Sequence, residues 1–127
     1  MYPISIKGVI FSPRREVILL LNERDEWELP GGRIELGETP AECLAREILE
    51  ALSLDVQVGA PVDTYLFEVM PGRQVFVATY QCSPIGPFNP VLSPEHKSIG
   101  LFAPEALPPN LPRGYRASIA TVVARPT

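Results

Sequence analysis

The chain has 127 residues, of which 46% are hydrophobic and 20% are charged, and its formal net charge is −4. This size and composition predict one globular domain over residues 1–127 with a core of its own. The acidic balance argues against a nucleic-acid polymer as a partner, because proteins that bind such polymers carry a basic excess. A small phosphorylated ligand remains compatible with it, since a bound cation reverses the local field.

The first part of the chain carries the signals of short strands. ISIKGVIF (4–11) and EVILLLN (16–22) are expected to be strands joined by the turn SPRR. WELP (27–30) is expected to be a short extended piece that ends at its proline. The sequence PGG (30–32) then predicts a tight turn whose bare backbone can approach an ion or a ligand.

The helix with the clearest signals begins after Thr39. TPAE (39–42) has the pattern of a capping box with proline at the first helical position, and good helix formers follow. Ser53 stands at the expected end of the helix, where a left-handed backbone costs about 1 kcal/mol. Glu47 and Glu50 are three apart and therefore share one face. The expected apolar face consists of Cys43, Leu44, Ile48, Leu49 and Leu52.

The second half predicts a hairpin, a loop and a closing helix. VDTYLFEVM (62–70) and QVFVATYQC (74–82) are rich in β-branched and aromatic residues and are separated by PGR, which favours a β-hairpin. Prolines crowd residues 84–112, so we expect a long loop there, with a short strand at IGLFA (99–103) and one helical turn. GYRASIATVVA (114–124) predicts an amphipathic helix.

The sequence has no pattern for export or for membrane insertion. MYPISIKGVIF (1–11) lacks the basic region, long apolar core and cleavage site of a signal peptide, and VILLL (17–21) is too short to cross a bilayer. Cys43 and Cys82 are too few for a disulfide framework and are expected to be small buried hydrophobes. We therefore expect a cytoplasmic protein with no membrane partner.

Residues 29–54 gather acidic side chains next to the glycine pair. Glu35 and Glu38 follow the glycines in a short loop, and the helix presents Glu47 and Glu50. Several carboxylates and a free carbonyl are thereby brought together. Hard divalent cations prefer such oxygen ligands, and Mg²⁺ in particular uses few carboxylates together with waters and substrate phosphates.

The same stretch resembles the signature box of the Nudix hydrolase family, which includes MutT-like proteins. That box consists of a glycine, five residues, a glutamate, seven residues and then REUxEExGU, where U is a bulky aliphatic residue. Here the box spans residues 32–54, with Gly32, Glu38 and REILEALSL (46–54) at the matching positions. The flanking WELPG, SPEH, LF and PEAL segments are also similar to the family.

The resemblance implies a fold and a reaction. The fold is a Nudix-type α/β/α sandwich around a mixed β-sheet. The reaction is the hydrolysis, dependent on Mg²⁺ or Mn²⁺, of a nucleoside diphosphate linked to another moiety, so the implied partner is a small nucleotide-like diphosphate. Nudix domains often pair, and a homodimer is therefore also considered.

By matching position, the resemblance also implies site residues. Glu47 and Glu50 would be metal ligands or would orient the attacking water, and the carbonyl of Gly32 would be a further metal ligand. Arg46 would hold the carboxylates in place. Glu95, in the late loop, would be a metal ligand or the general base.

Three residues are assigned to the substrate side. Glu38 would brace the loop or the neighbouring arginine. Arg33 could contact a phosphate, with an exposed solubilising charge as the alternative. Phe76 could flank a nucleobase, with a place in the sheet core as the alternative. His96, the only histidine, is expected to be structural.

Two positions depart from the box. Ala51 replaces the second glutamate of the EE pair, and Ser53 replaces the glycine. The missing carboxylate predicts weaker metal binding at a site that still works. The alternative is a catalytically weakened or inactive Nudix-fold module that binds a nucleotide. A third hypothesis, an interaction domain in which the box is a relic, has no positive support in the sequence.

Overall fold

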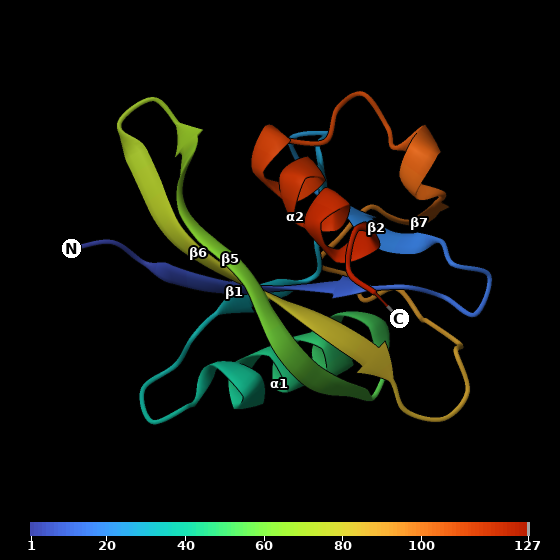
Figure 1. Cartoon of the computed structure of the whole chain (residues 1–127). Coiled ribbons are helices and arrows are strands. Elements are labelled where there is room, and N and C mark those ends of the chain that lie inside the picture. Colours follow the sequence, from blue (N-terminus) through green and yellow to red (C-terminus); the bar gives the residue numbers. More distant parts are fainter. Residues whose placement is uncertain (127) are drawn as a thin grey trace.

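The computed structural model describes residues 1–126; Thr127, the last residue of the predicted domain, lies outside them. Strands and helices mix along the chain, as Figure 1 shows. The elements are β1 (Ile4–Ile10), β2 (Val17–Leu21), β3 (Trp27–Glu28), β4 (Gly31–Arg33), α1 (Pro40–Leu52), β5 (Val56–Met70), β6 (Arg73–Pro84), β7 (Ser98–Phe102), the 3₁₀ turn η1 (Pro104–Ala106) and α2 (Arg113–Val123).

The strands form two sheets. In the four-stranded sheet the order is β4-β1-β6-β5, with β1 parallel to β6 and the other neighbours antiparallel. The second sheet, β3-β2-β7, is antiparallel. Helix α1 covers one side of the larger sheet, and α2 lies on its other side (Figure 1). A mixed sheet between two helices confirms the predicted fold class.

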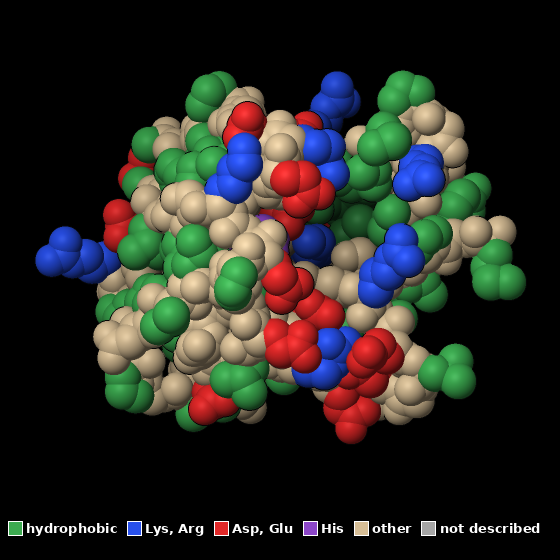
Figure 2. Space-filling view, turned by 180° about the vertical axis from the view of Figure 1, so that it is seen from behind, with side chains coloured by type: hydrophobic (Ala, Val, Ile, Leu, Met, Phe, Trp, Pro, Cys, Tyr) green, Lys and Arg blue, Asp and Glu red, His purple; other side chains and the backbone are tan. Residues whose placement is uncertain are grey.

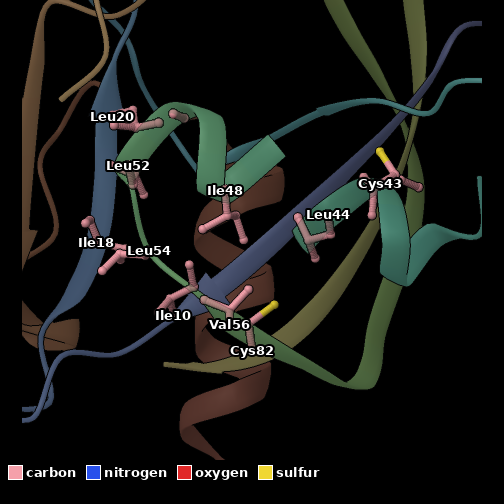
Figure 3. Close-up of a cluster of buried hydrophobic side chains, with 12 residues drawn as sticks. Ile10, Ile18, Leu20, Cys43, Leu44, Ile48, Leu52, Leu54, Val56 and Cys82 are labelled. Carbon is pink, nitrogen blue, oxygen red and sulfur yellow. The ribbon is translucent and has the colours of Figure 1, made fainter. Parts of the chain in front are cut away.

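Two apolar clusters hold these layers together. The first lies between α1 and the larger sheet (Figure 3), and the second surrounds α2. Because both sides of β1 are covered, six of its seven residues are buried. The first cluster consists of Ile6, Ile10, Ile18, Leu20, Cys43, Leu44, Ile48, Ala51, Leu52, Leu54, Val56 and Cys82. Both cysteines are free and buried, as predicted.

The predicted ends of α1 are confirmed. Thr39 Oγ1 accepts a hydrogen bond from the Glu42 amide at 3.1 Å, and Glu42 Oε1 accepts one from the Thr39 amide at 2.9 Å. Ser53 adopts the left-handed conformation with φ 54°, and its amide donates to the Leu49 carbonyl at 2.9 Å. The helix therefore starts and stops where its sequence signals stand.

Three details of the prediction are wrong. Strand β5 begins at Val56 rather than at residue 62, because Pro61 is accommodated at register shifts in an edge strand. The PGG segment forms the short strand β4 rather than a tight turn, since Gly31–Arg33 pair with β1. On α1, Leu49 is 50% exposed, and Ala51 is buried in its place.

No helix within residues 1–126 is long and apolar enough to cross a membrane.

Candidate active site

Glu47 lies where helix α1 meets the edge strand β4. Gly32 pairs with Ile6, and a Cβ added to Gly32 would overlap the Glu47 carboxylate. Glycine at this position therefore lets the carboxylate lie directly against the β4 backbone. The thiol of Cys43, one turn earlier on α1, donates to the Gly32 carbonyl at 3.7 Å. The bare backbone was expected to approach an ion or a ligand, and in the structure the group that it approaches is the Glu47 carboxylate.

Arg46 is at the centre of the acidic group. It donates to Glu38 through Nε at 2.6 Å and through Nη2 at 2.9 Å, so the contact is bidentate. Its Nη1 donates to Glu47 at 2.9 Å and lies 3.4 Å from Glu50. Glu35 Oε1 is 3.5 Å from Nη2. One guanidinium thus contacts four carboxylates, which confirms that α1 and the preceding loop converge.

Within the acidic group around Arg46, the pKa values of Glu38 and Glu47 are shifted in opposite directions. Hydrogen bonds from Arg46 hold the pKa of the Glu38 carboxyl at about 2. The pKa of Glu47 is raised, because its burial and the charges of Glu50 and Glu95 outweigh the contact with Arg46. Glu38 is therefore a fixed anion that supports the arginine, whereas Glu47 accepts a proton more readily than an ordinary glutamate.

Glu95 faces the same site from the late loop. That loop is fastened to the end of α1, because the Val91 amide donates to the Leu52 carbonyl at 2.8 Å and the Ser93 amide donates to the Ala51 carbonyl at 3.1 Å. Glu95 itself is exposed, yet its charge raises the pKa of Glu47. The loop therefore brings a further carboxylate towards the α1 group.

The same loop explains the burial of Ala51. Ala51 is 6% exposed and lies one helical turn after Glu47, under the segment that holds Ser93. It belongs to the apolar cluster between α1 and the larger sheet. Alanine is therefore a packing residue here as well as a missing carboxylate.

The donor set suits a cation that takes only part of its ligands from protein. Within residues 1–126, no three His, Cys, Asp or Glu side chains are arranged to hold a metal ion by themselves. Arg46 occupies the space between the carboxylates and neutralises part of their charge. Glu47, Glu50 and the Gly32 carbonyl offer hard oxygen atoms. Such a set fits Mg²⁺, which keeps several waters and binds substrate phosphates.

The structure does not bring all the predicted substrate residues to this group. Arg33 is exposed, and its carbonyl accepts from Arg46 Nη2 at 3.4 Å. Arg33 lies opposite Ser5, so its side chain belongs to the α2 side of the sheet. Phe76 pairs with Ile4 and lies on the α1 side of β6. The two residues are thus on opposite faces.

A second polar group lies beside the acidic one, and sequence reasoning missed it. Glu28, in β3, accepts hydrogen bonds from Asn22 at 3.2 Å and contacts His96 Nε2 at 3.0 Å. Burial raises the pKa of Glu28, but the charge of Lys7 and the contacts with His96 and Asn22 lower it to about 2. His96 thus ties the late loop to β3, which is the structural role expected of it. One signal was present: Lys7 is a charged residue inside an apolar strand.

The pKa of Glu28 predicts a dependence of stability on pH. Its folded value of about 2 is below the ordinary 4.5, so charged Glu28 stabilises the fold above pH 4.5 and this contribution is lost as the pH falls towards 2. We expect Glu28→Gln to reduce the free energy of unfolding by about 2–3 kcal/mol at neutral pH. Urea unfolding of both proteins should give a difference that shrinks between pH 4.5 and 2. A constant difference would contradict the assignment.

The contacts of Arg46 predict the effect of removing it. Arg46→Ala leaves four carboxylates without their shared cation, so we expect a lower melting temperature at neutral pH and a metal affinity reduced about 10- to 100-fold. Arg24→Ala is the matched control, since Arg24 is an exposed arginine that contacts Glu26 at 3.4 Å. Calorimetric Mn²⁺ titration and thermal unfolding measure both effects. Equal results for the two variants would show that Arg46 does not organise the site.

Comparison with known proteins identifies the family. The family model described as the NUDIX domain matches residues 1–122. The chain belongs to this family. The match includes residues 32–54, the stretch that resembles the Nudix box, and helix α1 within it.

Curated relatives of this Nudix chain match it in part. A MutT-like protein of Streptomyces ambofaciens is 29% identical over 87 residues, which is 68% of this chain and 54% of that protein. An 8-oxo-dGTP diphosphatase of Proteus vulgaris is 35% identical over 54 residues, which is 42% of this chain and 47% of that protein. The Nudix chain thus spans about half the length of these relatives.

Solved structures show the same fold over nearly the whole chain. A MutT Nudix hydrolase from Burkholderia pseudomallei superposes with a TM-score of 0.83 at 22% identity, covering 96% of this chain and 98% of that one. A MutT protein from Methanosarcina mazei Go1 has a TM-score of 0.81 at 23% identity, covering 94% and 91%. At sequence identities of 22% and 23%, the structural similarity establishes the fold and nothing about the function.

Proposed function

We propose that residues 1–127 form a single Nudix domain that hydrolyses a nucleoside diphosphate linked to another moiety, with Mg²⁺ or Mn²⁺ as the cofactor. The observation that carries the proposal is the carboxylate group around Arg46, in which Glu47 lies against the β4 backbone at Gly32. The Proteus relative is a diphosphatase, which supports a phosphoric anhydride as the bond that is cleaved.

In this proposal Glu47, Glu50 and the Gly32 carbonyl hold the metal, and Glu95 is a further ligand or the general base. When bound, a divalent cation screens the charge of the diphosphate and acidifies water. The carboxylates orient that water for attack on phosphorus and take up its proton while the bridging P–O bond breaks.

Arg46 and Glu38 are assigned a supporting role. Their bidentate contact fixes the guanidinium, which in turn fixes the orientation of Glu47. Arg33 borders the same edge from the other face of the sheet and is assigned to a substrate phosphate. Phe76 remains assigned to a nucleobase by the sequence alone. Pairing of two copies and a cytoplasmic location also remain predictions from the sequence.

One observation favours a second candidate function, a module that binds a nucleotide without turnover. Ala51 removes a carboxylate that the box usually supplies, and it is 6% exposed. Incubation with nucleoside triphosphates, dinucleoside polyphosphates and nucleotide sugars in Mg²⁺ or Mn²⁺ separates the two functions. Release of nucleoside monophosphate supports the hydrolase. Thermal stabilisation by a nucleotide with no product supports the module.

A further inference from the structure

Lys7 is the one buried basic residue within residues 1–126. It lies in the middle of β1 and is 7% exposed. Of the two lysines, only Lys97 has a hydrogen-bonded or ion-paired ammonium in the described part of the chain. The ammonium of Lys7 lies 5.8 Å from the ring centre of Tyr115 and close enough to Glu28 to lower the pKa of that carboxyl. The Lys7 ammonium thus has no hydrogen-bond acceptor within residues 1–126.

The neighbours of Lys7 do not supply that acceptor. Both oxygens of Glu28 already have partners, since Oε1 contacts His96 and Oε2 accepts from Asn22. Tyr115 presents the face of its ring. The N–H groups of Lys7 therefore have no protein partner, and an oxygen atom brought to them by a ligand gains a charge-assisted hydrogen bond.

Lys7 lies on the α2 side of the larger sheet, where its ammonium is over the ring of Tyr115. Side chains alternate along β1, so Pro3, Ser5 and Lys7 share the α2 side. Pro3 lines an open cavity of about 810 Å³, together with Val75 and Arg33, and Lys7 follows four residues later along the chain without lining that cavity itself. Gly31 pairs with Lys7 on the edge strand and brings no side chain that could cover it. Figure 2 shows this hollow beside the acidic group, with basic side chains around and within it.

The cavity and the acidic group meet at β4. Gly32 points its backbone towards Glu47 on the α1 side, whereas Arg33 belongs to the α2 side and also lines the cavity. A diphosphate held at Gly32 therefore has its attached moiety within reach of the cavity. Arg24 and Arg73 line the same cavity, together with Glu23 and Glu68.

We propose that Lys7 is a specificity-determining residue whose ammonium donates hydrogen bonds to an oxygen atom of the moiety attached to the diphosphate. The inference rests on the proposed function for the position of the diphosphate. The oxygen comes from one of two sources, the carbonyl of a nucleobase or an anionic group on the second moiety. Substrates without an oxygen at that place bind more weakly.

Two ligand pairs that differ at one group test the proposal by calorimetry, with Ca²⁺ replacing Mg²⁺ to limit turnover. Inosine triphosphate differs from purine riboside triphosphate by one base carbonyl, and UDP-glucuronic acid differs from UDP-glucose by a carboxylate. Lys7→Met removes the ammonium and keeps the shape, while Glu28 keeps its contacts with Asn22 and His96. Thr79→Val is the matched control, because Thr79 is fully buried and pairs with Lys7 on β6.

We expect the unmodified protein to prefer the oxygen-bearing member of one pair by about 10- to 100-fold. Lys7→Met should abolish that preference, and Thr79→Val should keep it. A preference within the purine pair assigns the oxygen to the base, and a preference within the sugar pair assigns it to the second moiety. An unmodified protein that distinguishes neither pair, or a preference that survives Lys7→Met, overturns the proposal.

The experiments distinguish rejection of the proposed hydrolase activity from rejection of the role of Lys7. If Mg²⁺ produces no hydrolysis of any compound while the Lys7-dependent preference in binding persists, the site is a binding module and the role of Lys7 stands. If hydrolysis occurs and depends on Glu47, but Lys7→Met leaves both binding preferences intact, only the role of Lys7 is rejected.

Discussion

Glu47→Gln should abolish turnover while leaving the fold at least as stable as before. The variant loses a proton acceptor and a metal ligand together, so we expect the rate to fall about a thousandfold or more. Stability should not fall with it, because the raised pKa of Glu47 means that its charged form is unfavourable in the folded protein at neutral pH. The neutral amide removes that cost.

Rates and melting temperatures of the purified variant measure the two effects. Glu105→Gln is the matched control, since Glu105 is an exposed glutamate in η1, remote in sequence from the box. It should leave both quantities unchanged. If Glu47→Gln keeps more than a small part of the activity, Glu47 is not the central group of the site. If the variant unfolds, its loss of activity carries no information about chemistry, and the predicted stability is wrong.

Ala51→Glu should make the protein less stable without metal and more responsive to metal. The new carboxylate would be introduced at a position that is 6% exposed and one turn from Glu47. A buried, uncompensated charge at such a site is expected to cost about 3–4 kcal/mol. A divalent cation would gain a ligand there, and binding to the folded state alone raises stability.

Urea unfolding in EDTA and at saturating MgCl₂ tests this coupling. The gain in free energy of unfolding on adding Mg²⁺ should be larger for Ala51→Glu than for the unmodified protein, and the Mg²⁺ concentration needed for activity should fall. Ala120→Glu, on the exposed side of α2, is the control and should respond like the unmodified chain. Equal gains for all three proteins would show that residue 51 does not face the metal.

The box and its helix could be predicted from the sequence because their signals are local. The capping box at Thr39, the stop at Ser53 and the spacing of Glu47 and Glu50 each involve residues only a few positions apart. Local signals also placed the hairpin turn and the short strand β7 to within a residue. The convergence of carboxylates on Arg46 followed from the same short stretch of chain.

The remaining features depend on contacts between distant segments. The rotation of α1 that buries Ala51 and exposes Leu49 depends on the loop around Ser93, which packs on the helix only in the folded chain. The contact between Glu28 and His96 joins residues 68 apart in sequence. No local sequence pattern predicts a contact between residues so far apart in the chain. The long strand β5 was missed for another reason, because Pro61 is a strand breaker unless an edge position and register shifts accommodate it.

The central claim is that Glu47, Glu50 and the backbone at Gly32 together hold a divalent cation although the box lacks one carboxylate. Crystals soaked in MnCl₂ and measured for anomalous scattering test it most directly. The account predicts one or more strong peaks beside these oxygen atoms, which disappear in the Glu47→Gln variant. Ordered side chains with no peak beside them, or a peak that persists in Glu47→Gln, would contradict it.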